Sequence, residues 1–203
     1  MPGKIIVSGV GCCLVDMLFN DIDFSGEAIR PFLSKNRGDG GLTPGHLVFA
    51  EEFENYCGSS FLNVISQITG GREYDKINIG GPSIVSLINA AQLTDNDYCE
   101  IRFYGCGGND DLGKNLTSLL KRTPVILHDY KLINNQTPCT FVLSDPSYEN
   151  GHGERMFINS IGASWKYRPE ELDDDFFNSD IVVFGGTALV PQIHDSLTSL
   201  LKK

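Results

Sequence analysis

The sequence predicts an α/β fold built on a mainly parallel sheet flanked by helices. The first observation is a set of short apolar runs of the kind that form strands buried on both faces of a sheet. These runs are Ile5–Val7 and Ile181–Phe184, and two further strands are predicted at Ile101–Tyr104 and Val125–His128. The second observation is that helical patterns separate these runs, which indicates parallel strands joined by right-handed crossovers. The third is a length of 203 residues, enough for one sizeable core.

The first strand, Ile5–Val7, is followed by two glycines and then by Asp16. We expect Asp16 just beyond the strand's carboxyl end, within an apolar run, where an unpaired carboxylate is costly. Ligands bind at this end of parallel strands, so ligand hydroxyl groups are one predicted partner, and a helix cap or a salt bridge is the alternative. Gly9 and Gly11 begin a dinucleotide-binding fingerprint, but Leu14 occupies the place of its third glycine.

Residues 20–78 are expected to be an insertion. Turn-forming residues occupy 39–45, and helical spacing is predicted over 49–56 and 61–68, the latter ending at Gly70. We expect this segment to lie over the sheet edge as a lid or cap. A surface for a partner protein is the alternative.

The stretch Asn78–Leu93 is the one around which we expect the chain to be organised. Gly80 and Gly81 lead into an apolar run with helical spacing, which predicts one buried helix face. The residues of that face are Ile84, Leu87, Ile88 and Ala91. Glycines let the backbone bend sharply and let a ligand approach it, and the free amides of the first helical turn suit hydroxyl oxygens or an anion. The alternative is a simple turn before a packed helix.

A second glycine-rich stretch, residues 105–113, precedes helical spacing at 116–120. A glycine-rich loop before a helix is typical of phosphate binding. However, Asp110 and Asp111 would repel phosphate, and no Gly-Lys-Ser/Thr follows. We therefore expect a structural tight turn in which one of the two aspartates caps the helix.

The last third of the chain predicts a hairpin and one further strand and helix. Alternating runs at Thr140–Ser144 and Arg155–Ile158 indicate a β-hairpin with a long tip. A short helix is expected at Pro169–Leu172. The buried strand Ile181–Phe184 then leads to a helix over Gln192–Leu201. The residues expected on one face of this helix are Ile193, Leu197, Leu200 and Leu201.

The composition limits the class of partner. The net charge is −10, whereas nucleic acids and anionic membranes are bound through clustered Lys and Arg, so we expect neither. No apolar run is long enough for a membrane span, and the N-terminus lacks the apolar core of a signal peptide. The six cysteines form no Cys-x-x-Cys pair. We expect no metal site and read the cysteines as reduced thiols in a cytoplasmic protein.

Five patterns, in this order, resemble the PfkB or ribokinase-like family of sugar and nucleoside kinases. They are a strand followed by an aspartate, a diglycine before a helix, a glycine-rich turn with an aspartate, a threonine-led hairpin with a Gly-Glu-Arg return, and a strand ending in glycine. The matching residues are Asp16; Gly80 and Gly81; Gly105, Gly108, Asp110 and Gly113; Thr137, Gly153, Glu154, Arg155, Gly162 and Ala163; and Phe184, Gly185 and Gly186. The resemblance implies a ribokinase-like fold with a small β lid. It implies a single domain over residues 1–203, with lid or cap segments at about 20–78 and 137–160.

The resemblance also implies a function, the transfer of a phosphoryl group from ATP, with Mg²⁺, to a sugar hydroxyl. It implies that Asp16, Gly80 and Gly81 hold sugar hydroxyls. Arg155 would reach the substrate or the developing charge from the lid, and a surface role on its strand is the alternative. Val85 stands where many members carry a substrate-contacting asparagine, so this contact is lost or supplied elsewhere.

The family's ATP-binding half has no counterpart in this sequence. The Asp-Thr-x-Gly-Ala-Gly-Asp stretch, which supplies the anion hole and the general base in the family, is absent. We therefore expect a truncated chain that carries the substrate-binding part, has no catalytic residue and is inactive by itself. A truncated sheet would expose an apolar edge, which favours self-association, including a homodimer through the lid.

Two other functions stay open at this point. The first is a non-catalytic sugar-binding or regulatory half-kinase that is complete at Lys203. The second is a dinucleotide-binding oxidoreductase, which rests on Gly9 and Gly11 alone.

Overall fold

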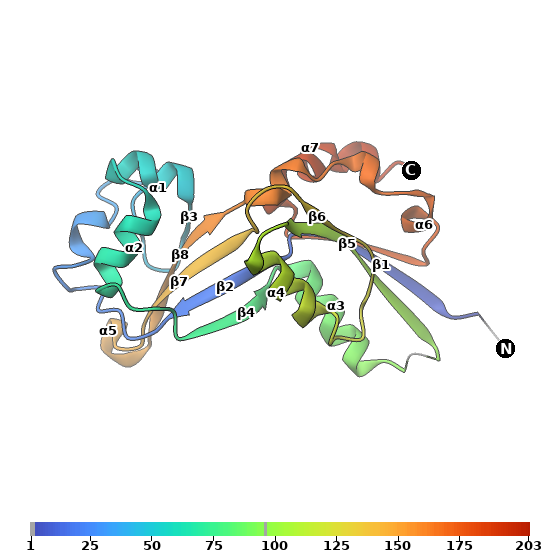
Figure 1. The fold of residues 1–203 in the computed structure, drawn as a ribbon, viewed down its shortest axis with the longest axis horizontal. Helices are drawn as coiled ribbons and strands as arrows, with labels where there is room; N and C mark the ends of the chain where they lie inside the picture. Colours follow the sequence, from blue (N-terminus) through green and yellow to red (C-terminus); the bar gives the residue numbers. More distant parts are fainter. Residues whose placement is uncertain (1–2, 96) are drawn as a thin grey trace. The chain divides into compact units, whose positions relative to one another are not determined.

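The chain folds into two compact units (Figure 1). The computed structural model describes residues 3–95 and 97–203. The parallel-sheet unit comprises Met1–Val15, Ile79–Pro138 and Ile161–Lys203, and the mixed-sheet unit comprises Asp16–Asn78 and Cys139–Ser160. Each unit has its own sheet and its own helices.

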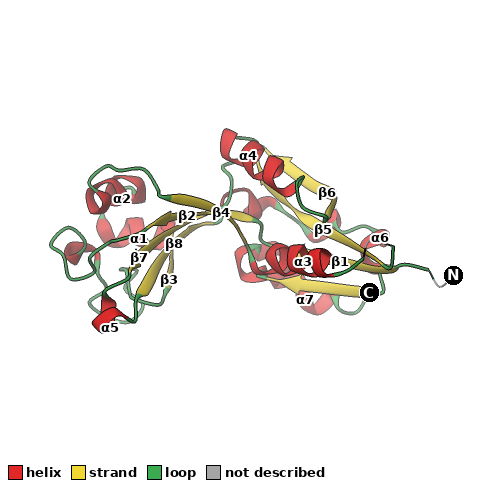
Figure 2. Cartoon of the chain, turned by 90° about the horizontal axis from the view of Figure 1, so that it is seen from below, coloured by secondary structure: helices red, strands yellow, loops and turns green. Residues whose placement is uncertain are grey.

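Within the described residues, the parallel-sheet unit is built on four strands that all run in one direction, in the order β6-β5-β1-β9. These strands are β1 (Ile5–Gly11), β5 (Cys99–Gly108), β6 (Ile126–Ile133) and β9 (Ile181–Gly185). Helices lie on both faces of the sheet (Figure 2), so the predicted parallel α/β arrangement is confirmed. They are α3 (Pro82–Leu93) and α4 (Asp111–Leu120) on one face, and α6 (Asp174–Phe177) and α7 (Pro191–Leu200) on the other.

Short 3₁₀ turns connect the later elements of this unit. They are η2 (Gly162–Lys166), η3 (Pro169–Glu171) and η4 (Thr187–Leu189). The helical turn expected at Pro169–Leu172 is therefore present as η3.

Each face of the parallel sheet has an apolar core. On one face α3 packs through Ile84 and Leu87, as the helical spacing predicts, although Ile88 is only half-buried. On the other face the ring of Phe176 meets the rings of Tyr104 and Phe184, with centroids 5.0 and 5.7 Å apart. Edge-to-face contacts of this kind bury much apolar area and hold α6 against the sheet.

The prediction that residues 105–108 form a turn is wrong, because β5 continues through all of them. Glycine is required here by packing within the strand. A Cβ at Gly105 would lie 2.7 Å from the ring of Phe103, and one at Gly107 would lie 2.4 Å from the hydroxyl of Tyr130. Large rings on adjacent positions fill the space that side chains at these two positions would need.

The buried character expected for the last strand is also wrong. β9 lies at an edge of the sheet, Ile181 is exposed, and the rest of the strand is half-buried. An apolar run therefore marks an edge strand as readily as a central one. Leu201, expected on the buried face of the last helix, lies just beyond α7 and is 71% exposed.

The mixed-sheet unit is built on five strands of the described chain, in the order β3-β8-β7-β2-β4. They are β2 (Leu14–Phe19), β3 (Leu47–Phe49), β4 (Lys76–Gly80), β7 (Cys139–Asp145) and β8 (Glu154–Ser160). The predicted hairpin is confirmed, because β7 and β8 pair antiparallel, while β3 runs parallel to β8. The sequence did not predict β2 and β4, since no turn signal separates β2 from β1 and β4 is short.

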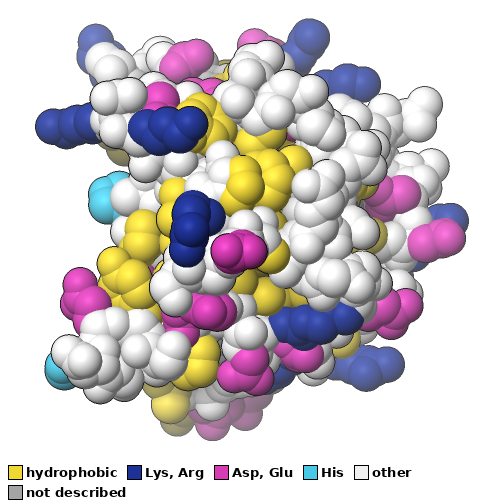
Figure 3. Space-filling model, turned by 90° about the vertical axis from the view of Figure 1, so that its left-hand side faces the viewer, with side chains coloured by type: hydrophobic (Ala, Val, Ile, Leu, Met, Phe, Trp, Pro, Cys, Tyr) yellow, Lys and Arg dark blue, Asp and Glu magenta, His cyan; other side chains and the backbone are white. Residues whose placement is uncertain are grey.

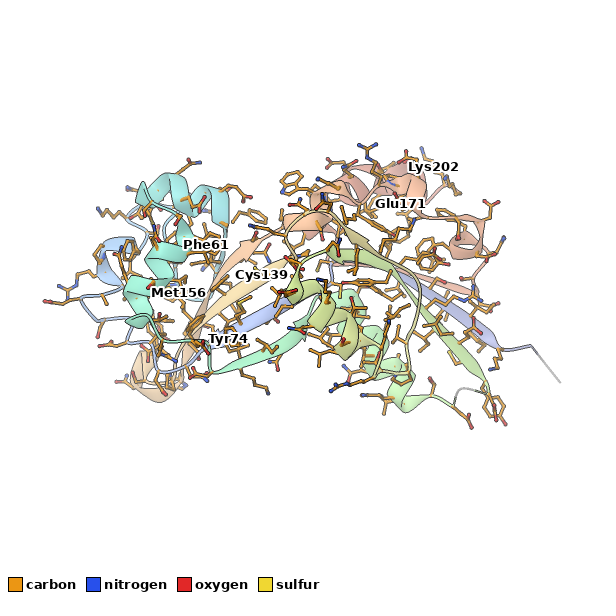
Figure 4. All side chains as sticks on the ribbon, viewed as in Figure 1. Phe61, Tyr74, Cys139, Met156, Glu171 and Lys202 are labelled. Atoms are coloured by element: carbon orange, nitrogen blue, oxygen red, sulfur yellow. The ribbon has the colours of Figure 1, made fainter. Side chains whose placement is uncertain are left out.

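Helices cover one face of the mixed sheet. The helices of this unit are α1 (Ala50–Cys57), α2 (Phe61–Thr69) and the single turns η1 (Arg30–Phe32) and α5 (Tyr148–Gly151). Figure 4 labels Phe61 on α2 and Met156 on β8. The ring of Phe61 meets that of Phe141 at 5.3 Å, and Met156 is fully buried. Because side chains alternate along a strand, the neighbours of Phe141 and Met156 point to the opposite face.

The helix boundaries follow local signals. The hydroxyl of Ser60 accepts a hydrogen bond from the Asn63 amide and starts α2, and Gly70 ends it in a left-handed conformation. The helices expected at 49–56 and 61–68 are thus confirmed as α1 and α2. None of the helices in residues 3–95 and 97–203 is long and apolar enough to cross a lipid bilayer.

Candidate functional site

The predicted substrate-binding residues fall into two groups, one in each unit. Asp16 and Arg155 belong to the mixed-sheet unit, whereas Gly80, Gly81 and Val85 belong to the parallel-sheet unit. The sequence predicts Asp16 just beyond the carboxyl end of the first strand. This prediction is wrong, because Asp16 lies within the next strand, β2. Its strand neighbours therefore set its surroundings.

Asp16 is half-buried and faces polar groups of the hairpin. Burial raises the pKa of this carboxyl above its ordinary value, because the charged form loses hydration. The hydroxyl of Thr140 and the positive charge of Arg155 act in the opposite direction and favour the carboxylate. β2 and the β7–β8 hairpin thus bring Asp16, Thr140 and Arg155 together on one face of the mixed sheet.

Asn159 completes this polar group, and sequence reasoning missed both it and Thr140. The two residues are paired in register across β7 and β8, and the Asn159 Nδ2 donates to the Thr140 Oγ1 at 2.8 Å. Asn159 is 0% exposed and Thr140 5%. The signal that could have found them is a polar residue at the end of each apolar run of the hairpin, Thr140 at the start of one run and Asn159 directly after the other. Their meeting with Asp16, more than 120 positions away in sequence, has no local signal.

Arg155 lies at the more exposed end of the same face. Its guanidinium lies over the ring of Phe157, 5.6 Å from the centroid, and its side chain is solvent-exposed. The N–H groups of an exposed guanidinium can donate to water or to a ligand. The described geometry therefore leaves Arg155 able to donate hydrogen bonds to a ligand near Asp16.

Gly81, the second glycine before α3, serves the packing of the chain itself. Gly81 has φ of +112°, and a Cβ there would lie 2.2 Å from the carbonyl oxygen of Cys12. Gly186 is similarly close, since a Cβ on it would lie 2.8 Å from the ring of Pro82. The start of α3 is therefore pressed against neighbouring backbone, which supports the reading of a turn before a packed helix. Ligand binding by Gly80 and Gly81 stays a prediction.

Val85 lies on the outer side of α3. It is 38% exposed, and its carbonyl oxygen accepts a hydrogen bond from the side chain of Asn89 at 3.0 Å. An apolar side chain at this position offers no hydrogen bond to a ligand. Asn89, one turn further along α3, is the nearest asparagine on this side of the helix. Its side-chain amide already donates to the carbonyl oxygen of Val85.

In the glycine-rich stretch, the carboxylate of Asp110 already has several hydrogen-bond partners. The Asp110 carboxylate accepts hydrogen bonds from the Gly113 amide at 2.8 Å, the Thr137 amide at 2.8 Å and the Thr137 hydroxyl. Burial acts to raise the pKa of Asp110, but these hydrogen bonds outweigh it and leave the pKa below its ordinary value. The predicted aspartate cap of this helix is confirmed for Asp110.

The mixed-sheet unit also carries an open hollow of about 930 Å³, and none of the predicted substrate-binding residues lines it. The loop Leu33–Pro44 forms most of its wall, together with parts of β3 and α1. Asp39 holds the loop by accepting hydrogen bonds from the amides of Lys35, Asn36 and Gly41. Its carboxylate therefore supports the loop and is already engaged.

The face of the molecule shown in Figure 3 mixes charges of both signs. Lys and Arg side chains alternate with Asp and Glu side chains around hydrophobic ones. Over this face the charges do not gather into a large patch of one sign.

No protein-family model matches the sequence, and no curated protein matches it either. Solved structures do match. Adenosine kinase from Anopheles gambiae superposes with a TM-score of 0.65 at 17% identity, over 95% of this chain and 52% of its own. A probable sugar kinase from Rhizobium etli CFN 42 gives a TM-score of 0.62 at 18% identity, over 90% and 47% of the two chains. Adenosine kinase from Sinorhizobium meliloti gives a TM-score of 0.61 at 19% identity, over 89% and 47%.

The chain therefore shares the fold of these adenosine and sugar kinases, and the predicted ribokinase-like fold is confirmed. It spans about half the length of the solved structures that it matches.

Proposed function

We propose that this chain carries the substrate-binding part of an ATP-dependent kinase that phosphorylates a hydroxyl group of a sugar or nucleoside. The observation that carries the proposal is the polar face of the mixed sheet, where Thr140 and Asn159 are paired across the hairpin and the charge of Arg155 favours the Asp16 carboxylate. The shared fold supports a kinase role in general, since the similar structures are kinases of these two substrate classes.

The chemistry of this face suits a polyhydroxylated, uncharged ligand. A carboxylate accepts hydrogen bonds from adjacent hydroxyl groups of a sugar ring, and Asp16 is half-buried, so these bonds form with little competition from water. The exposed Arg155 would donate to a hydroxyl or ring oxygen at the rim. Gly80, Gly81 and Val85 remain proposed substrate contacts in the parallel-sheet unit.

The described residues do not fit a site for ATP or Mg²⁺. The glycine-rich stretch is closed by the chain itself, because a Cβ on Gly108 would lie 2.4 Å from both the Asn135 oxygen and the Thr137 nitrogen. Its aspartate is engaged by Thr137. Nor do three His, Cys, Asp or Glu side chains of residues 3–95 and 97–203 gather as metal ligands would. ATP and Mg²⁺ therefore enter the proposal through the shared fold alone.

Calorimetric titration of the 203-residue chain with adenosine and with D-ribose tests the substrate-binding role. We expect heat of binding for at least one compound, and a loss of about tenfold or more in affinity in Asp16→Asn, since hydrogen bonds to a charged group are lost. Glu51→Gln, an exposed carboxylate on α1 of the same unit, is the matched control and should bind as the wild type does. Absence of binding to both compounds, or full affinity in Asp16→Asn, would contradict the proposal.

A second function, sugar binding without catalysis, is favoured by the misfit of the described residues to ATP. Measurement of ADP formation with ATP, Mg²⁺ and the bound compound separates the two. Turnover would support the kinase and contradict the non-catalytic role. Binding without turnover agrees with both, because the substrate-binding part of a kinase is expected to be inactive by itself. Self-association through the mixed-sheet unit and a cytoplasmic location remain predictions.

A further inference from the structure

The strand β9 has no neighbouring strand on its outer edge in the part of the chain that the structure describes. It is the last strand of the order β6-β5-β1-β9, and β1 pairs with its inner edge. An edge strand presents a row of unpaired amide and carbonyl groups to any strand that aligns with it. The outer edge of β9 therefore has the backbone groups that strand addition uses.

The other edge strands of the described residues carry features that discourage such pairing. β6 contains Asp129 and Lys131, β4 contains Lys76, and β3 has only three residues. Charged side chains and short length are the usual protection of a sheet edge. β9 has the sequence Ile-Val-Val-Phe-Gly, without charge or proline, and its register with β1 runs without interruption. It therefore lacks the protection that the other three edges have.

The side chains of β9 are incompletely covered within one copy of the chain. Ile181 is 51% exposed, and Val182, Val183 and Phe184 are half-buried. Val182 and Phe184 pack against the core that contains Phe176. Because side chains alternate along a strand, Ile181 and Val183 project to the opposite face. A neighbouring strand would thus take apolar area on both faces of the sheet out of water.

We infer that two copies of this chain associate through the outer edges of β9, which pair antiparallel about a two-fold axis. The occupant is a second copy because the chain itself supplies the uncharged and unprotected strand that this edge accepts. A two-fold axis lets the same surface serve both copies. The inference is independent of the proposed function, because Asp16 and Arg155 belong to the other unit.

The alignment that uses the whole strand places Val183 of one copy opposite Val183 of the other. Phe184 then lies opposite Val182, and a pair of an aromatic and a β-branched side chain stabilises a sheet. The exposed Ile181 lies opposite Gly185, which has no side chain to oppose it.

The charge directly before β9 favours the antiparallel direction. Asp180 precedes the strand and is exposed. A parallel pair in register would place the two Asp180 carboxylates side by side, and like charges directly opposite are destabilising. The antiparallel pair holds the two carboxylates at opposite ends.

Sedimentation velocity of the full chain at increasing concentration tests the dimer. We expect the wild type to shift from monomer to dimer, and Val183→Lys to weaken dimerisation by about tenfold or more, because two lysines then face each other across the axis. Ile181→Lys should act in the same direction, and its exposed position keeps the change outside the core. Circular dichroism checks that each variant is folded.

Two outcomes of this measurement would overturn the proposal. One is a wild type that stays monomeric up to the highest concentration at which it remains dissolved. The other is dimerisation at the wild-type level in a folded Val183→Lys or Ile181→Lys variant.

Leu47→Lys is the matched control, because Leu47 is a 44% exposed apolar residue on β3, an edge strand of the mixed sheet. This variant should dimerise as the wild type does. A dimer that is lost in Leu47→Lys and kept in Ile181→Lys would overturn the proposal and support self-association through the mixed-sheet unit.

Cross-linking tests the register. Residues directly opposite each other in an antiparallel pair have Cα atoms about 4.5–5.5 Å apart, a separation that a disulfide spans. With oxidised glutathione, Val183→Cys should therefore give more disulfide-linked dimer than the wild type, whose six cysteines are free thiols. Ile181→Cys should give less than Val183→Cys, because the two substituted positions are then far apart. Equal cross-linking of the two variants, or none in Val183→Cys beyond the wild-type level, would overturn the antiparallel pairing.

Discussion

Position 81 requires glycine because the backbone of a residue far away in the sequence, Cys12, lies close to it. The positive φ of Gly81 and the carbonyl of Cys12, 2.2 Å from where a Cβ would sit, both exclude a side chain. A double glycine in the sequence does not distinguish this cause from contact with a ligand. The structure shows a close backbone contact for Gly81 and leaves its ligand role to experiment.

Gly81→Ala is therefore expected to destabilise the protein by more than φ strain alone, which costs about 1 kcal/mol or slightly more. Gly70→Ala is the matched control, since Gly70 also has a positive φ but nothing within 4 Å of its Cβ position. Urea unfolding of both variants provides the comparison. Equal losses of unfolding free energy would show that the Cys12 carbonyl moves away without cost.

Asp110 is expected to make stability depend on pH. Its pKa in the folded state lies below the ordinary value, so its charged form stabilises the fold at neutral pH. That contribution is lost as the pH falls below about 4 and through the folded-state pKa. Asp110→Asn should therefore show a smaller fall in unfolding free energy between pH 7 and pH 3 than the wild type.

The control for this measurement is Asp111→Asn. Asp111 is the adjacent aspartate, and its side chain is 97% exposed. This variant should keep the pH dependence of the wild type. Equal pH dependence in Asp110→Asn and the wild type would show that Asp110 acts only as a neutral cap.

At the scale of elements, the apolar residues of α3 that recur at helical spacing pack against the parallel sheet. Leu87 is 3% exposed and Leu93, on the same helix, is 87% exposed. Leu87→Ala should cost about 2–5 kcal/mol of unfolding free energy, because it leaves a cavity against the parallel sheet. Leu93→Ala should cost less than about 0.5 kcal/mol. Thermal unfolding of the two variants tests this, and similar losses would mean that α3 is not held by its inner face.

Strand boundaries were harder to predict than helices. A helix has capping residues and a hydrophobic period that a few neighbouring residues reveal. For α2, Ser60 is the N-terminal cap and Gly70 is the C-terminal cap. β2 follows β1 after two residues without a glycine or proline between them, and its apolar composition does not alternate. For this reason the sequence does not indicate the strand that carries Asp16, and it predicts Asp16 at a strand end instead.

At the scale of the whole molecule, the two units have separate cores. Phe53 is fully buried in the mixed-sheet unit, where its ring meets that of Phe32 at 6.4 Å. Phe176 is fully buried in the parallel-sheet unit. A loss of packing in one core should therefore loosen that unit first.

Phe53→Ala is expected to cost about 3–5 kcal/mol in its unit. In hydrogen-exchange measurements, faster exchange should be concentrated in residues 16–78 and 139–160. Phe176→Ala should show the complementary pattern in the other unit. Uniformly faster exchange over the chain in both variants would show that the two units unfold as one.

The sequence by itself determined the α/β class, the main helices, the hairpin and an aspartate cap at Asp110 or Asp111. These features depend on hydrophobic period, turn chemistry and capping, which act over a few neighbouring residues. Only the tertiary structure decided that Asp16 lies within a strand, and that Thr140, Arg155 and Asn159 gather beside it. It also decided that Gly81 is required by the Cys12 carbonyl. Strand pairing brings residues together across more than a hundred positions, and the local pattern of apolar residues carries no record of which strand becomes the neighbour.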